Sequence, residues 1–178
     1  KLNESLPMKI SQHFGVLYTL LVIGQIILCN YSNFGPYVML TMLPAMVLCL
    51  PTGQSTMMTM IIAFCSGLSV DWLSEGLLGL NAAALVPVAL VRKQVIRIFL
   101  GEDLLTRGDS FSFRKNGFAK ISAANMGCLI LFLTLYIILD GASTLPTWFC
   151  LTKGAVSTAC NFILAIIVTN ILCSDDRK

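Results

Sequence analysis

The feature that most constrains this chain is a 61-residue stretch, residues 10–70, that contains no lysine, arginine, aspartate or glutamate. A soluble domain carries charge at about 25% of its positions. Here 12% of residues are charged, 56% are hydrophobic and the mean hydropathy is +0.82. A long uncharged stretch of this kind lies in lipid, because a spanning helix needs roughly 20 mostly apolar residues. The sequence therefore predicts an all-α integral membrane protein.

Turn residues and charges divide the chain into six apolar runs, and we predict that each is a transmembrane helix of a single domain, 1–178. The second to fourth runs hold only 14 to 16 residues, or roughly 21–24 Å of helix against a hydrocarbon core of ~30 Å. Polar flanks and snorkelling cations can extend such short helices. A re-entrant second segment, which gives five spans, is the alternative. The predicted helices cover about 14–30, 37–50, 55–70, 77–91, 121–139 and 154–173.

The basic residues predict an orientation, because cytoplasmic loops are enriched in lysine and arginine. With six spans and cytoplasmic N- and C-termini, eleven of the twelve basic residues lie inside and only Lys153 lies outside. The outer loops then hold Asp71, Glu75 and Asp140. This asymmetry favours an even number of helices with both ends in the cytoplasm.

The segment 92–120, between the fourth and fifth runs, carries seven basic and three acidic residues, a net charge of +4. We predict that it is a cytoplasmic basic loop, partly amphipathic and close to the inner membrane surface. The charge either only sets the topology or forms a docking surface for a cytoplasmic partner. The candidate residues of this basic surface are Arg92, Lys93, Arg97, Arg114 and Lys115.

Three polar side chains are predicted to lie at a similar depth towards the outer leaflet: Gln25, Asp71 and Asn81. A polar group that faces lipid costs several kcal/mol, so these side chains should face one another, a cavity or a partner helix. In one interpretation Asp71 merely ends a helix and Asn81 caps the next. In the other, the three form a polar patch that binds a partner's transmembrane segment.

Small residues accompany this patch in the third and fourth runs. Ala63 and Gly67 stand four residues apart, and Gly79 precedes a run of three alanines at 82–84. Small residues let helix backbones approach closely, which is a common basis of helix packing in lipid. We predict that the two helices form a tight hairpin, in which Ala63, Gly67 and Gly79 belong to the packing surface.

The sequence shows no pattern that is typical of a catalytic or cofactor site. His13 is the only histidine, and the seven cysteines are scattered without a CxxC pair, which argues against a metal site. Paired intramembrane carboxylates and a glycine-rich phosphate loop are also missing. We therefore expect no enzymatic activity, no cofactor, no metal and no nucleic-acid partner.

Residues 63–72 read Ala-Phe-Cys-Ser-Gly-Leu-Ser-Val-Asp-Trp, and residues 76–84 read Gly-Leu-Leu-Gly-Leu-Asn-Ala-Ala-Ala. With Gln25 and Gly35-Pro36 before them, these elements resemble the rod shape-determining protein MreD family of bacteria. That family has a Phe-x-x-Gly-Leu-x-x-Asp motif at a helix end, then a glycine-rich turn and a helix of small residues. The specific motifs cover about residues 24–93, and beyond them only the hydropathy agrees.

The resemblance implies a non-enzymatic, multi-pass subunit of the bacterial inner (plasma) membrane that belongs to the cell-elongation (rod shape) complex. The partners it implies are the bitopic MreC protein, the actin-like MreB filament, and the glycosyltransferase and transpeptidase that build peptidoglycan, besides membrane lipids. The MreD family is also similar in its six-helix arrangement to the substrate-binding subunits of energy-coupling-factor transporters. A vitamin-binding subunit of such a transporter is therefore the alternative function. It would need an outer pocket, for which Tyr31, Trp72 and Trp148 are the obvious stacking residues.

Overall fold

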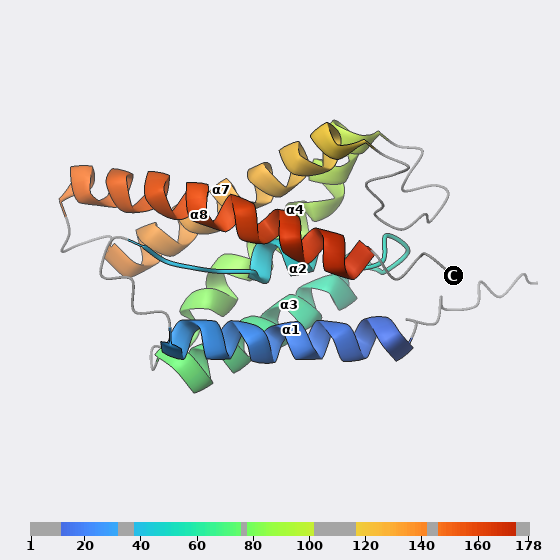
Figure 1. Ribbon diagram of the computed structural model, residues 1–178, viewed down its shortest axis with the longest axis horizontal. Coiled ribbons are helices and arrows are strands. Elements are labelled where there is room, and N and C mark those ends of the chain that lie inside the picture. The colour runs from blue at the N-terminus through green and yellow to red at the C-terminus, as the bar shows by residue number, and fades with distance from the viewer. Residues whose placement is uncertain (1–11, 32–37, 76–77, 102–116, 142–145, 174–178) are drawn as a thin grey trace, which may run out of the picture.

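All regular elements in the computed structural model are helices, which confirms the all-α prediction for the residues that the structure describes (Figure 1). The described residues are 12–31, 38–75, 78–101, 117–141 and 146–173. The elements are α1 (Gln12–Tyr31), α2 (Leu43–Leu48), α3 (Thr56–Val70), the π-helix η1 (Asp71–Glu75), α4 (Leu80–Leu100), α7 (Phe118–Gly141) and α8 (Thr147–Cys173).

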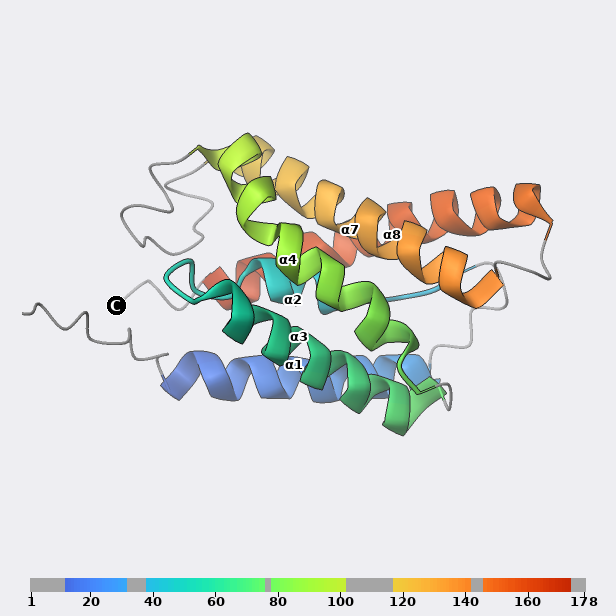
Figure 2. The ribbon, with the colours of Figure 1, turned by 180° about the vertical axis from the view of Figure 1, so that it is seen from behind.

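The long helices run side by side in one bundle, with α4 packed along both α3 and α7, and with α8 packed along α7 (Figures 1 and 2). Helix α1 lies at the edge, next to α3. We call one end of the bundle the Lys120 end, where α1, α3 and α7 begin and α4 and α8 end. The other end is the Asp71 end, where η1 leads into α4.

Four helices are long and apolar enough to cross a membrane, which supports a membrane location. These candidate spans are Phe14–Tyr31, Thr56–Ser74, Phe118–Asp140 and Trp148–Leu172. Helix α4 has 21 residues, or about 31 Å of rise, but cations interrupt its apolar run in the second half.

The predicted loop 92–120 is helical at both of its ends. Helix α4 does not stop at residue 91 but continues to Leu100, and Gly101 follows with a φ of 93°. Helix α7 already begins at Phe118. The predicted helix end at residue 91 is wrong because lysine and arginine are good helix formers, so Arg92 and Lys93 do not stop the helix. Arg114 and Lys115 lie outside the described residues.

The second predicted helix, 37–50, is also different: within 38–50 only Leu43–Leu48 are helical, residues 38–41 run as an extended link in Figure 1, and Met42 caps the helix with a φ of −98° and a ψ of −12°. Two prolines explain the short helix. Pro44 occupies the first turn, and its ring would clash with the carbonyl of a preceding helical turn. Pro51 disfavours the helical conformation of Leu50 before it. The segment still passes through the middle of the bundle towards the Lys120 end (Figure 1).

Helix α2 is the centre of the hydrophobic core. All six of its residues are buried, and α4, α7, α8 and α3 surround it. The largest fully buried apolar side chains include Leu43, Met46 and Leu48 of α2, and Phe132 of α7. A short apolar helix inside a bundle is possible only if the polar backbone at its ends finds partners, which the next subsection describes.

Candidate functional site

Asp71 caps the N-terminus of α4 from across the hairpin. Its Oδ2 accepts hydrogen bonds from the backbone N–H groups of Gly79 at 3.0 Å and Ala82 at 3.2 Å, and its Oδ1 accepts one from Asn81 N–H at 3.0 Å. The first N–H groups of a helix have no partner within it, and a negative charge there is favourable. Gly79 makes the turn with a φ of 97°, a conformation that favours glycine. Asp71 is completely buried.

Gly67 brings α3 against the backbone of α4. A Cβ atom added at Gly67 would lie 2.7 Å from Ala82 Cα and 2.8 Å from Ala82 N, which is closer than any real contact of this kind. Ala63, one turn earlier on α3, is fully buried. The predicted tight hairpin is therefore present, with Gly67 at a close backbone contact. Gly79 was wrongly predicted to belong to the packing surface: a Cβ there would meet nothing within 4 Å, and Gly79 forms the turn instead.

The structure does not bring Gln25, Asp71 and Asn81 together as an exposed polar patch. Each of the three is at most 1% exposed, so none can contact a partner's helix directly. Asn81 is not a side-chain cap either: its Nδ2 and Oδ1 are buried with no hydrogen-bond partner among the described residues. Gln25 bonds to a different part of the chain.

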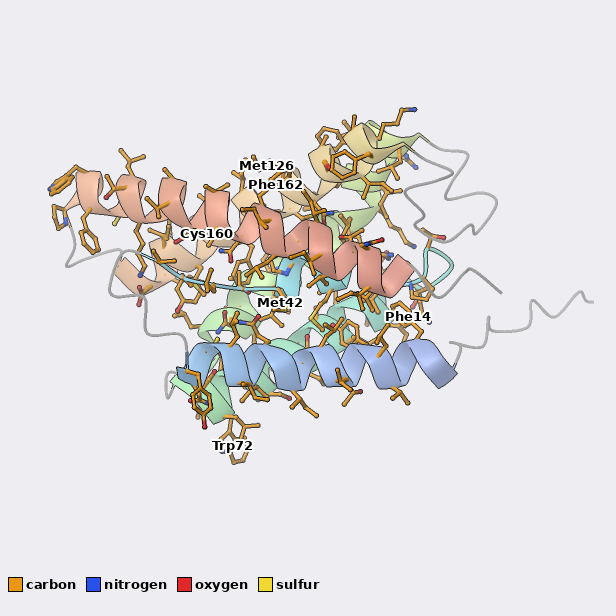
Figure 3. All side chains as sticks on the ribbon, viewed as in Figure 1. Phe14, Met42, Trp72, Met126, Cys160 and Phe162 are labelled. Carbon is orange, nitrogen blue, oxygen red and sulfur yellow. The ribbon has the colours of Figure 1, made fainter. Side chains whose placement is uncertain are left out.

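Gln25 and Asn161 hold the non-helical segment 38–42 from opposite sides. On the α1 side, Gln25 Oε1 accepts from Met42 N–H at 2.7 Å, and Gln25 Nε2 donates to Leu40 C=O at 3.1 Å. On the α8 side, Asn161 Oδ1 accepts from Thr41 N–H at 2.8 Å, and Asn161 Nδ2 donates to the carbonyl of Met39 at 2.7 Å. Figure 3 shows Met42 between α1 and α8.

This arrangement follows from the geometry of an extended backbone, in which alternate residues present their N–H and C=O groups to opposite edges. Each side-chain amide gives the segment one N–H donor and one oxygen acceptor, so it replaces the backbone of a neighbouring strand. Ser157 adds a further bond, because its Oγ accepts from Met39 N–H at 3.0 Å. Irregular backbone at membrane depth is stable only when protein groups satisfy it in this way.

Arg92 caps the other end of the second segment. Its Nε donates to Leu48 C=O at 3.1 Å, and its Nη2 donates to Leu50 C=O. A cation beside the last carbonyls of a helix is favourable. Arg92 is 1% exposed, so its predicted place on a cytoplasmic surface is wrong. The reason is that α4 continues past it, and position 92 falls on the buried face that Leu85 and Val88 begin.

Of the other residues of the predicted basic surface, the structure describes Lys93 and Arg97. Lys93 is half-buried and Arg97 is exposed. Deeper in the interior, Asn125 Nδ2 of α7 donates to Thr169 Oγ1 of α8 at 2.9 Å. Within the described ranges, no group of three histidine, cysteine, aspartate or glutamate residues could hold a metal ion.

No model of a protein family matches the chain, and neither the curated proteins nor the solved structures contain a match.

Sequence reasoning missed Ser157, Asn161 and the partners of Arg92. An available signal was the presence of two amides, Asn161 and Asn170, in an apolar run, because polar residues within a span usually face the protein interior. This signal does not tell which of the two amides faces the interior: Asn161 is fully buried, whereas Asn170 is exposed. The backbone groups that Asn161 and Ser157 bind lie about 120 residues away in sequence.

We expect Asn161→Leu to lower the free energy of unfolding by roughly 2–4 kcal/mol, because it leaves Thr41 N–H and the Met39 carbonyl without partners in the interior. Thermal unfolding in detergent measures the change. Asn170→Leu is the matched control on the same helix, and its effect should stay within about 0.5 kcal/mol. Equal destabilisation by the two substitutions would contradict the proposed support of the non-helical segment.

Proposed function

We propose that the chain is a non-enzymatic inner-membrane subunit of the bacterial cell-elongation complex, of the MreD type, which binds an MreC-type bitopic protein and through it the peptidoglycan synthesis machinery. The observation that carries the proposal is the joint between α3 and α4. The two residues that define the motif resemblance, Gly67 and Asp71, build this joint by close backbone approach and by capping α4.

The use of the interior polar groups supports a scaffold. Gln25, Asn161, Asp71 and Arg92 each bind backbone groups of the same chain. Their hydrogen-bonding groups hold the backbone of the chain in place. A bundle held in this way can present a constant outer surface to partners.

The surface of α1 is our candidate for the MreC-type partner. Of the four candidate spans, α1 is the one least covered by the rest of the protein, with 17% of its apolar window buried against 33–50% for the others. Its exposed apolar residues recur at helical spacing along one face, which suits a single transmembrane helix. They are Val16, Leu20, Ile23 and Ile27.

The Lys120 end is our candidate for the cytoplasmic side, where an MreB-type filament would be found. Lys93 and Arg97 in the second half of α4 and Lys120 in the first turn of α7 lie at this end. The enrichment of cytoplasmic segments in basic residues supports this orientation.

Co-purification from the native cell tests the proposal. The tagged chain should capture an MreC-type protein, and Leu20→Ala with Ile23→Ala should reduce the capture several-fold, because contacts within a helix pair in lipid depend on close packing. The matched control is Ile163→Ala with Ile167→Ala on the exposed face of α8, which should leave the capture unchanged. All four positions are exposed to a similar degree, between 50% and 63%.

Failure to capture such a protein with the folded wild-type chain would contradict the proposal. A vitamin that raises the melting temperature of the purified chain would instead favour the substrate-binding subunit of a transporter, since tight binding stabilises the folded state by mass action.

A further inference from the structure

Three large side chains are exposed at the Asp71 end of the bundle, where α1 ends and η1 follows α3. Tyr31 is 86% exposed, Trp72 is 74% exposed and Leu73 is 60% exposed. Figure 3 shows Trp72 pointing away from the bundle. We call these three residues the aromatic tip. Side chains of this size and exposure make an apolar surface that needs a partner other than water.

The aromatic tip is held in place by the polar contacts of its neighbours. Asn30, the residue before Tyr31, donates from Nδ2 to the carbonyl of Leu73 at 3.2 Å, which joins the end of α1 to η1. Asp71, the first residue of η1, is fully buried and binds the start of α4. Because Asp71 is fixed towards the interior, the two residues that follow it on η1 face outward.

Two of the candidate membrane spans end at the aromatic tip. The span of α1, Phe14–Tyr31, has 18 residues, and the span of α3 with η1, Thr56–Ser74, has 19. At 1.5 Å per residue these lengths correspond to roughly 27–28 Å, close to the ~30 Å of a hydrocarbon core. Two helices that each cross the core once therefore bring the tip to the level where hydrocarbon meets the headgroups.

The residue types of the tip match the chemistry of that level. Tyrosine and tryptophan each combine a large apolar ring with one polar group, a hydroxyl or an indole N–H. Tryptophan and tyrosine are enriched at membrane–water interfaces, where the ring lies among the upper acyl chains and its polar group reaches ester and phosphate oxygens. A purely apolar lateral face of a span has no use for these polar groups.

We propose that the aromatic tip binds the interfacial layer of the adjacent lipid leaflet, with the Tyr31 hydroxyl and the Trp72 indole N–H donating to lipid oxygens and Leu73 among the upper acyl chains. The tip thereby fixes the depth of α1 and α3 in the membrane. A lipid layer suits the tip better than a protein partner, because the exposed rings lie where two spans end. The inference requires a membrane location, but it does not depend on the proposed role in cell elongation or on the orientation of the chain.

The test measures the depth of Trp72 by fluorescence quenching. The chain contains two tryptophans, so Trp148→Phe leaves Trp72 as the only one. The full-length variant is reconstituted into phosphatidylcholine vesicles that carry bromine on the acyl chains, either close to the glycerol or close to the chain ends. Iodide in the buffer reports access from water. We expect the shallow bromine to quench Trp72 more strongly than either the deep bromine or iodide does.

The control places a tryptophan in the middle of the α1 span. Ile23→Trp, combined with Trp72→Phe and Trp148→Phe, uses a position that is 52% exposed and therefore accessible to lipid. In this variant the deep bromine should quench more strongly than the shallow one, which is the reverse of the order expected for Trp72.

Four results would overturn the proposal. Strongest quenching by iodide would place Trp72 in water, and strongest quenching by the deep bromine would place it in the hydrocarbon core. Protection from all three quenchers would show that protein, such as a second copy of the chain, covers the tip. The same depth for Trp72 and for the tryptophan of Ile23→Trp would also contradict it. If Trp148→Phe does not fold, the fluorescence of Trp72→Phe is subtracted from that of wild type, and the same criteria apply.

Discussion

Replacing Asp71 with leucine is expected to lower the free energy of unfolding by about 3–5 kcal/mol, the largest effect of any single substitution that we predict. The change removes the acceptor of three backbone N–H groups, those of Gly79, Asn81 and Ala82, in a place where water cannot replace it. It also removes the negative charge at the N-terminus of α4. Unfolding in detergent, followed by circular dichroism over increasing denaturant, measures the loss.

Two further variants distinguish capping from a general effect of losing an acid. Asp71→Asn keeps one acceptor oxygen but turns an amide donor towards backbone donors, so we expect an intermediate loss. Asp140→Leu removes a carboxylate that is partly exposed and paired with Lys153, and it should cost no more than about 1 kcal/mol. A similar cost for Asp71→Leu and Asp140→Leu would show that the buried cap does not stabilise the hairpin.

Gly67→Ala is expected to lower the free energy of unfolding by about 1–3 kcal/mol, although alanine is the better helix former. The added methyl group would stand 2.7 Å from Ala82 Cα. Because the atom in the way belongs to the backbone, only separation of α3 from α4 can relieve the contact. That movement would also lengthen the hydrogen bonds between Asp71 and the start of α4.

Gly24→Ala is the matched control for this substitution, because a Cβ at Gly24 in α1 meets nothing within 4 Å. Helix propensity then dominates, and the variant should be as stable as wild type or more stable by up to about 1 kcal/mol. The two substitutions add the same methyl group to a helical glycine, and their predicted effects have opposite signs. If Gly24→Ala destabilises the protein and Gly67→Ala does not, the close approach at Gly67 is contradicted.

The hairpin between α3 and α4 could be predicted because its signals are local. The small residues and Asp71 all lie within residues 63–84. Their spacing alone therefore places the small residues at a helix contact and Asp71 at a helix end. The roles within the polar patch could not be predicted in the same way. The limits of an apolar run give the depth of Gln25 along its helix but not the direction of its side chain around the helix. That direction decides that Gln25 binds residues 40 and 42.

The sequence by itself determined the all-helical class, the apolar character of the four candidate spans, and the approximate starts of α1, α3, α4 and α7, but not the end of α4 or the start of α8. These features depend on local composition, because a charged side chain in lipid is costly wherever the rest of the chain lies. Only the tertiary structure decided the path of residues 38–48 and the burial of Arg92. Both depend on hydrogen bonds between distant segments, such as Thr41 with Asn161 and Leu48 with Arg92, and a local pattern contains no information about which distant partner completes them.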